Sequence, residues 1–280
     1  MKIKKSKILI IVVFVLGLMV LLYPFVSMLI SSIFQTKVIN NYNYSVEQME
    51  KDKMDKELQK AQEYNDKIKS VTEIIKDPFT DKNSTVPSDY KEILDVNGVI
   101  GYIEIPKINI NVPIYHGSTD DILAMGIGHL ETTGFPIGGL GNHSVLSGHR
   151  GLPTAKMFTD LDKMEVGDDF FIHVLDQTLE YKVDQIKVID PSDTSDLMPV
   201  PDKDYVTLLT CTPLGINSHR LIVRGERVEY NDSENEPIPF YKHREFYLIV
   251  VAILVILSAL IIWIIRKRRK EQNENEGQCN

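Results

Sequence analysis

Residues 205–228 read YVTLLTCTPLGINSHRLIVRGERV. Two runs of apolar and β-branched residues, 205–209 and 221–223, flank a connector rich in turn residues, which predicts two strands joined by an irregular loop. Cys211 lies where the first strand ends, and Arg220 lies where the second begins. A positive charge beside a cysteine favours the thiolate, which is the nucleophilic form. The stretch therefore predicts a chemical site, provided that a base lies nearby.

Two long apolar segments, residues 8–30 and 246–265, are each long enough to cross a bilayer. The first follows a basic segment, residues 1–7, and the second precedes a basic cluster that opens the polar tail, residues 266–280. Because basic residues favour the cytoplasmic side, we expect both termini in the cytoplasm and the middle outside, joined to the second span by a tether at 230–245. A cleaved signal peptide is the alternative interpretation of the N-terminus, although the apolar run exceeds a usual signal-peptide core.

The middle of the chain is acidic. Residues 35–244 hold 22 of the 31 Lys and Arg residues and 35 of the 39 Asp and Glu residues, a net charge of −13. This balance argues against nucleic acid as a partner. The sequence has no clustered metal-ligand spacing, phosphate-binding glycine loop or nucleotide signature, so we expect no cofactor and no metal.

Strand-like segments follow one another over residues 99–229, which we expect to form the catalytic domain. Seven or eight short strands in about 130 residues predict a closed barrel, and the fold class is therefore mainly β. A helix is expected at 154–164, a short helix at 90–94, and a surface loop near the site at 191–204. The segments with strand patterns are GVIGYIEIPKINI, NVPIYHG, HSVLSGH, DFFIHVL, TLEYKVDQIKVID, YVTLLTC and RLIVRGERV.

Residues 31–98 are predicted to form a helical region outside the membrane. Ser45, with Gln48 three residues later, makes a capping-box pattern, which predicts that a helix begins there. Apolar residues at helical intervals continue to about residue 75 and predict one or two amphipathic helices. Asp77-Pro78-Phe79 then ends the helical region, because proline disfavours helical geometry in the residue before it.

Cys211 is the one cysteine of the outside portion, because Cys279 follows the second apolar segment. The two thiols cannot pair across a membrane. Extracytoplasmic cysteines are commonly found in disulfides, so a single unpaired cysteine there needs a reason. Burial as a small apolar residue is the ordinary explanation, and a nucleophile is the alternative.

Among seven histidines, His149 has the context that suits a base. It follows an apolar run at a Ser-Gly turn, hence at a strand end, as Cys211 does, and side chains at one mouth of a barrel can converge. His143, six residues earlier on the same strand, would lie about 20 Å away at roughly 3.3 Å per residue. Arg220 remains protonated and suits charge stabilisation, although an exposed ion pair is its ordinary explanation.

These stretches resemble the sortases, the membrane-bound cysteine transpeptidases of Gram-positive bacteria, and most closely the pilus-assembling class C. The resemblance covers roughly residues 70–230 and implies an eight-stranded barrel with Cys211, His149 and Arg220 as the catalytic residues. We consider Leu209, Thr210 and Thr212, beside the cysteine, as candidates for the substrate pocket. The matching segments are TLLTC, TPLGINSHRLIVRG, SVLSGHRGLPTAKMFTDLDKM (144–164), GIGHLE (126–131) and DPF (77–79).

The resemblance also implies a reaction. The substrate would be a C-terminal sorting signal of the Leu-Pro-x-Thr-Gly type, cut between Thr and Gly through a thioester on the cysteine. In class C, the acyl group passes to a pilin lysine and builds covalent pili. The DPF tripeptide matches a class C lid, in which Asp77 would meet Arg220 and Phe79 would cover Cys211. Phe79 stands where many relatives carry tryptophan, and Leu214 where an aromatic residue is common.

Three alternatives remain at this point. A sortase that anchors surface proteins to peptidoglycan would use a cell-wall amine as acceptor, and a hydrolytic cysteine protease would use water. A catalytically inactive peptide-binding surface protein belongs to another class. The partners expected for the leading interpretation are pilins or surface proteins with sorting signals and the lipid bilayer, in a two-pass membrane protein whose catalytic domain is extracellular.

Overall fold

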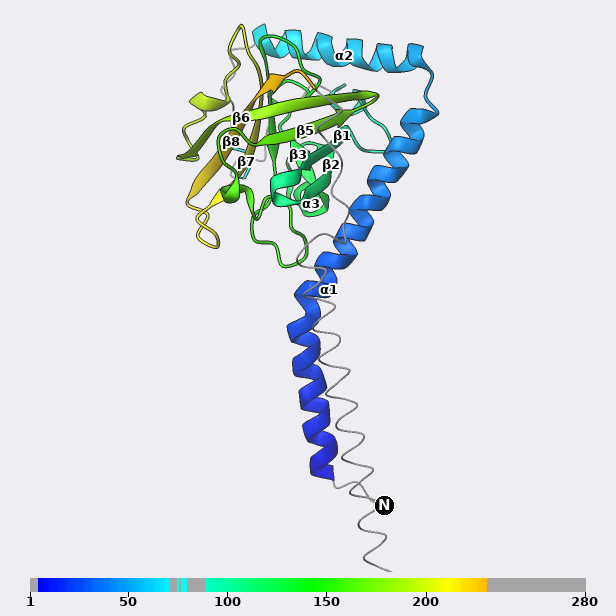
Figure 1. Cartoon of the computed structure of the whole chain (residues 1–280), viewed down its shortest axis with the longest axis vertical. Helices are drawn as coiled ribbons and strands as arrows, with labels where there is room; N and C mark the ends of the chain where they lie inside the picture. The colour runs from blue at the N-terminus through cyan, green and yellow to red at the C-terminus, as the bar shows by residue number, and fades with distance from the viewer. Residues whose placement is uncertain (1–4, 71–74, 76, 80–88, 231–280) are drawn as a thin grey trace, which may run out of the picture. The chain divides into compact units, whose positions relative to one another are not determined.

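The computed structural model describes residues 5–70, 75, 77–79 and 89–230, and its centre is a closed barrel of eight strands (Figure 1). Around the barrel the strand order is β1-β2-β3-β4-β7-β8-β6-β5. The predicted fold class, mainly β with a closed eight-stranded barrel, is confirmed. The strands are Gly101–Ile105 (β1), Ile110–His116 (β2), Ile127–His129 (β3), Asn142–Ser147 (β4), Asp169–Val174 (β5), Gln177–Ile189 (β6), Asp204–Thr212 (β7) and His219–Val228 (β8).

Two apolar clusters lie on opposite faces of the same strands. The main core fills the barrel with alternate residues of all eight strands, such as Val206 and Leu208 of β7 and Val223 of β8. Because side chains alternate between faces, the residues between them point outward. On β4, β7 and β8 these outward residues are also buried. With apolar residues from neighbouring segments they form a second cluster, called the outer cluster below: Ile75, Leu130, Val145, Ile189, Leu197, Leu209 and Ile222.

Helix α1 (Lys5–Glu47) is continuous from the apolar N-terminal segment to the barrel (Figure 1). From Val13 onward it is long and apolar enough to cross a membrane, with a mean hydropathy of 2.5 and its apolar window exposed. Its second half packs on the barrel through a stripe at helical spacing, which consists of Gln35, Ile39, Tyr42 and Val46. The Tyr42 hydroxyl donates to Ile100 O and accepts from Leu175 N. One N-terminal apolar helix therefore fits a membrane anchor.

The predicted helix start at Ser45 is wrong. Ser45 lies in the last turn of α1, and the chain breaks after Glu47 before α2 (Lys51–Ser70) begins. The capping-box pattern is a local signal, whereas burial of Tyr42 and Val46 against the barrel favours continuing the helix through this point. Tertiary packing has overridden the local preference.

Helix α2 lies across one end of the barrel (Figure 1). The Asn65 amide both donates to Phe135 O and accepts from Phe135 N, and the Tyr64 hydroxyl donates to Glu131 O. Tyr64 also stacks edge-on against Phe135, with 5.0 Å between ring centroids. These contacts hold the helical region to the segment between β3 and β4.

The segment after β4 differs most from its prediction. Instead of a helix at 154–164, the chain forms turns and a short 3₁₀ helix, Leu161–Lys163. Phe158 N donates to His149 O and not to an acceptor within a helix. Met157 has φ of +40°. Met157, Phe158 and Leu161 enter the core instead, so burial rather than helix propensity decides their conformation.

Three smaller differences concern element bounds. The hairpin turn between β1 and β2 falls at the 3₁₀ helix Pro106–Ile108, inside a segment predicted as one strand. Helix α3 (Asp120–Met125) was not predicted. The expected helix at 90–94 is the 3₁₀ helix Tyr90–Glu92. The predicted tether, second span and tail, from residue 231 onward, lie outside the described residues.

His129 on β3 is a buried imidazole with both nitrogens engaged. Its Nε2 lies 2.8 Å from Gly134 O, and its Nδ1 lies 2.9 Å from the Tyr90 hydroxyl. Burial lowers the pKa of His129 to about 3. The folded state therefore keeps this ring neutral at pH values where an unfolded chain binds a proton.

We expect the free energy of unfolding to be insensitive to His129 above about pH 6.5 and to fall below it, by about 1.4 kcal/mol per pH unit, until the folded pKa is reached. Denaturant unfolding of the detergent-solubilised chain at about pH 7 and about pH 5 measures this slope. His129→Asn should reduce the slope, with a remainder from His143, whose pKa burial lowers to about 4. The exposed His219→Asn is the control, and an unreduced slope in His129→Asn would contradict the assignment.

Candidate active site

His149 and Cys211 are brought to one edge of the barrel by the parallel pairing of β4 with β7. The pairing ends at Ser147 opposite Leu209. One residue further, Gly148 N donates to Leu209 O, and the Thr210 hydroxyl donates to Gly148 O at 2.7 Å. Because parallel strands advance together, the next residues on the two strands, His149 and Cys211, follow at the same level.

Arg220 joins them from the neighbouring strand. Strand β8 runs antiparallel to β7, and Arg220 near its start pairs directly with Cys211. Cys211, Arg220 and the outer cluster share one face, because Leu209 and Ile222 lie two positions along their strands. The three residues predicted from the sequence to form the site therefore lie at one edge of the barrel.

The Asp77 carboxylate binds the Arg220 guanidinium. Asp77 Oδ1 accepts from Arg220 Nε and Oδ2 accepts from Nη2, both at 2.7 Å. The remaining nitrogen, Nη1, donates to the main-chain oxygens of Asn217 and His219. Both side chains are 4% exposed, so this is a buried, bidentate ion pair. Every nitrogen of the guanidinium is thereby engaged within the chain.

Phe79 lies between the histidine and the arginine. The centre of its ring is 5.1 Å from Arg220 Cζ and 6.2 Å from the centre of the His149 ring. Pro78 is buried beside it, and Phe79 itself packs against the outer cluster. The predicted approach of Asp77 to Arg220 is therefore present in the described residues, and Phe79 covers the groups around the thiol.

The protonation of the cysteine and histidine follows from this closure. Partial burial raises the pKa of the Cys211 thiol, Arg220 lowers it, and Asp77 raises it again, so that the net shift is upward. Burial also lowers the pKa of His149, against a smaller opposite effect of Asp120. Arg220 favours the thiolate, as the sequence predicted, but burial and Asp77 outweigh it. Both shifts favour the neutral forms, the thiol of Cys211 and the uncharged imidazole of His149.

Ile75 is a member of the outer cluster that the sequence did not single out. It is 4% exposed and lies four residues before Phe79, which packs against the same cluster. Both apolar side chains therefore pack on the outer faces of the strands that carry the site. The signal available in the sequence is an apolar residue placed beside the DPF tripeptide.

The three pocket candidates differ in accessibility. Leu209 belongs to the outer cluster, on the same face as Cys211. Thr210 is fully buried and points to the other face, where its hydroxyl is used by Gly148. Thr212 is partly exposed and accepts a hydrogen bond from Arg150. Leu209 and Thr212 therefore border the site, whereas Thr210 supports it from beneath.

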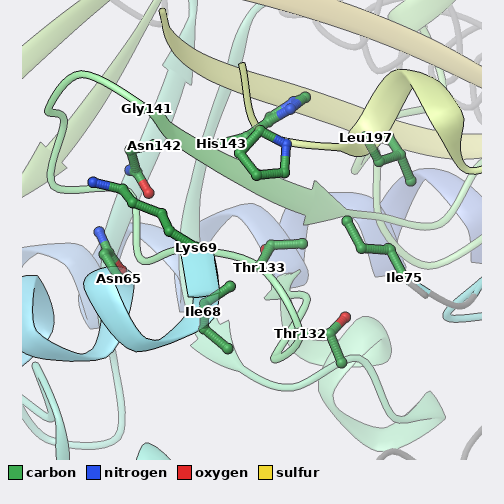
Figure 2. Close-up of a pocket in the computed structure, with 12 residues that line it drawn as sticks. Asn65, Ile68, Lys69, Ile75, Thr132, Thr133, Gly141, Asn142, His143 and Leu197 are labelled. Atoms are coloured by element: carbon green, nitrogen blue, oxygen red, sulfur yellow. The ribbon is translucent and has the colours of Figure 1, made fainter. Parts of the chain in front are cut away.

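His143, the rival histidine, lies away from the thiol at the start of β4. Its Nδ1 is 3.0 Å from Met198 O and its Nε2 is 2.7 Å from the Thr207 hydroxyl, so it has a structural role. Figure 2 shows it beside a cavity of about 20 Å³ that Ile68 of α2, Ile75 and Leu197 also line. This volume holds a single water at most, so it is no peptide site. Among the described residues, no three His, Cys, Asp or Glu side chains are grouped to hold a metal ion.

Comparisons with known proteins match this barrel. A model of the sortase domain matches residues 103–228. Sortase D of Bacillus subtilis is 32% identical over 152 residues, which cover 52% of this chain and 74% of that protein. Sortase A of Bacillus anthracis is 29% identical over 154 residues, covering 54% and 71%. The chain belongs to the sortase family.

Solved structures refine this assignment. Sortase C of Streptococcus pneumoniae is 44% identical, with a TM-score of 0.65, over 72% of this chain and 100% of that chain. Sortase C1 of Streptococcus agalactiae is also 44% identical, with a TM-score of 0.66, over 70% and 99%. The structural neighbours are thus class C sortases, and the resemblance to class C seen in the sequence is confirmed.

The ion pair between Asp77 and Arg220 makes a prediction about the thiol. We expect Asp77→Asn to lower the pKa of Cys211, because Asp77 raises that pKa and also offsets the charge of Arg220. The pH dependence of alkylation measures the shift, in a Cys279→Ser background so that one thiol reports. Asp176→Asn, which removes a partner of the exposed Lys51, is the control. A thiol pKa that is unchanged in Asp77→Asn would contradict the electrostatic role.

Proposed function

We propose that the protein is a membrane-anchored class C sortase that cleaves Leu-Pro-x-Thr-Gly-like sorting signals between Thr and Gly and transfers the acyl group to a pilin lysine. The observation that carries this proposal is the gathering of Cys211, His149 and Arg220 at one barrel edge, in a chain that is 44% identical to the whole of a solved sortase C. Helix α1 supplies the anchor, and the predicted second span completes a two-pass topology with the barrel outside.

In the proposed reaction, the Cys211 thiol passes its proton to His149, and Cys211 Sγ attacks the carbonyl carbon of the threonine. Arg220 and main-chain N–H groups stabilise the negative oxygen of the tetrahedral intermediate. The carbon–nitrogen bond then breaks, His149 protonates the leaving glycine amine, and a thioester remains on Cys211. His149 next accepts a proton from the incoming lysine amine, whose attack releases the thiol and forms an isopeptide bond.

The pilin acceptor is supported by the solved neighbours. The study of the Streptococcus pneumoniae enzyme concerns pilin substrate specificity, and a sortase C1 from a group B streptococcal pilus island covers 73% of this chain at 42% identity. A peptidoglycan amine or water as the acceptor would define the alternative sortase and protease activities. The product distinguishes them, because only the pilin acceptor gives a lysine isopeptide.

In this proposal residues 77–79 act as a closed lid. Asp77 and main-chain oxygens accept four hydrogen bonds from Arg220, which has five N–H donors, so they compete with a developing oxyanion for the guanidinium. Phe79 lies against the same guanidinium and the His149 ring, where a substrate must enter. The lid therefore opens before the first step.

We expect Arg220→Lys to lower the rate of transpeptidation by at least about 100-fold, because one ammonium does not reproduce the planar fork of the guanidinium. Cys211→Ala should be inactive. The assay incubates the full-length enzyme with a sorting-signal protein and a pilin and maps new isopeptide bonds by mass spectrometry. Arg227→Lys, a matched change on the same strand, should retain activity. Wild-type turnover in Arg220→Lys, or an isopeptide product from Cys211→Ala, would refute the proposed chemistry.

Opening of the lid has its own test. We expect the double variant Asp77→Ala/Phe79→Ala, in a Cys279→Ser background, to be alkylated at Cys211 at least about 10-fold faster than the parent, because removal of both contacts exposes the thiol and lowers its pKa. Lys51→Ala/Asp176→Ala, which removes an exposed ion pair on another part of the surface, is the control. Equal alkylation rates in the lid variant and its parent would show that residues 77–79 do not restrict access.

A further inference from the structure

Arg150, the residue after His149, connects the segment after β4 to the end of β7. Its side chain is 9% exposed, and each guanidinium nitrogen has a different partner. Nε donates to Thr159 O at 3.3 Å, Nη1 donates to the Thr212 hydroxyl at 3.0 Å, and Nη2 pairs with Asp162 at 2.5 Å. Two of these partners belong to the segment that follows β4, and Thr212 is the residue after Cys211.

The contact with Thr212 lies just beyond the last rung of the β4–β7 pairing. Behind the site, the strands are joined through Gly148 and Thr210. Beyond the site, the main-chain oxygen of His149 accepts a hydrogen bond from Phe158 N. The hydrogen bond from Arg150 to Thr212 then joins the two segments of the chain again. His149 and Cys211 are thus the residues enclosed between two cross-strand contacts.

A second contact joins the same two loops one residue further along. Gly151 has φ of +78°, and a Cβ placed on it would lie 2.4 Å from Leu214 Cδ1. Leu214 belongs to the connector between β7 and β8. The close approach needs glycine at this position, since any side chain would displace Leu214 and the backbone conformation is left-handed. The loops that carry His149 and Arg220 therefore pack directly against each other.

We infer that Arg150 is a positioning residue, which sets the separation of His149 from Cys211 by bridging Thr159, Asp162 and Thr212. This role rests on the transpeptidation proposed above, in which both groups exchange protons with the substrate. Asp162 is 49% exposed, so its ion pair with Arg150 contributes little by itself. The bond to Thr212 carries the effect, because it is the contact that reaches the strand of the nucleophile.

Lysine cannot replace Arg150 in this role. The three partners lie in three directions around a planar group, and a single ammonium on a flexible stem does not hold all three at once. A shift of about 1 Å in a catalytic group can lower turnover about 100-fold, even though the displaced residue touches no substrate.

The test uses the full-length enzyme with Arg150→Met, Arg150→Lys, Thr212→Val and the double variant Arg150→Met/Thr212→Val. We expect each single variant to lower kcat about 10- to 100-fold with KM changed less than about threefold, and Arg150→Lys not to restore it. The double variant should be no slower than Arg150→Met, because both changes remove the same contact. Arg227→Met is the matched control: its guanidinium donates to main-chain oxygens of Glu180 and Val228, and kcat should be unchanged.

A measurement that needs no sorting-signal substrate distinguishes the positioning role of Arg150 from the proposed function. The pH midpoint of Cys211 alkylation, in a Cys279→Ser background, should shift in both Arg150→Met and Thr212→Val, because both change the distance from His149 to the thiol. Thr212→Val is decisive, because it breaks the contact and leaves the charge of Arg150 in place. If wild type fails to transfer any acyl group while the midpoint still shifts, the transpeptidation is wrong and the positioning role stands.

Three results would overturn the role of Arg150. The first is an unchanged alkylation midpoint and kcat in Thr212→Val. The second is a double variant whose loss equals the product of the two single losses. The third is a loss in Arg150→Met that Arg227→Met reproduces at equal thermal stability, which would identify general destabilisation as the cause.

Discussion

The parallel pairing of β4 with β7 is the constraint on which the site depends. The two strands are separated by more than fifty residues in the chain, yet they end at the same edge of the barrel, at Ser147 and Leu209. A histidine and a cysteine placed two residues beyond that rung are held together without any contact of their own. Antiparallel β8 then starts where β7 ends, which adds a guanidinium beside the thiol. Strand direction alone thus assembles three side chains from three separate parts of the chain.

Strand direction brings the site residues together, whereas the local sequence only locates the strands. This difference explains what could be predicted. The apolar and β-branched runs 205–209 and 221–223 correctly located β7 and β8, and the strand-end positions of Cys211 and Arg220 followed from them. The strand-end position of His149 followed from the apolar run and the Ser-Gly turn before it. Local signals failed where packing decided the conformation. The capping-box pattern at Ser45 was overridden by burial of Tyr42 and Val46, and the expected helix at 154–164 gave way to burial of Met157 and Phe158. The place of Ile75 in the outer cluster and the bond from Arg150 to Thr212 could not be predicted, because these partners are distant in the chain.

In the described arrangement, burial favours the neutral forms of the Cys211 thiol and the His149 imidazole, and Arg220 is paired with a carboxylate. Burial raises the pKa of Cys211 and lowers that of His149, while a carboxylate occupies Arg220. The same guanidinium that would stabilise an oxyanion in the proposed reaction is satisfied by Asp77 in its absence. A buried cation without a partner is costly, so Asp77 also gives the empty site a stable resting form. In the proposed function, opening of the lid would change solvation, charge balance and access in one event.

Helix α1 passes from its exposed apolar segment to the barrel without a break, and Tyr42 ties its second half to Ile100 and Leu175. An enzyme anchored in this way has no flexible stalk at this junction. In the proposed membrane-anchored enzyme, the height of the cysteine above the lipid surface would then be set by the fold. The spacer between the cleavage motif of a client protein and that client's own hydrophobic tail would have to match this height, so spacer length would determine which clients are processed.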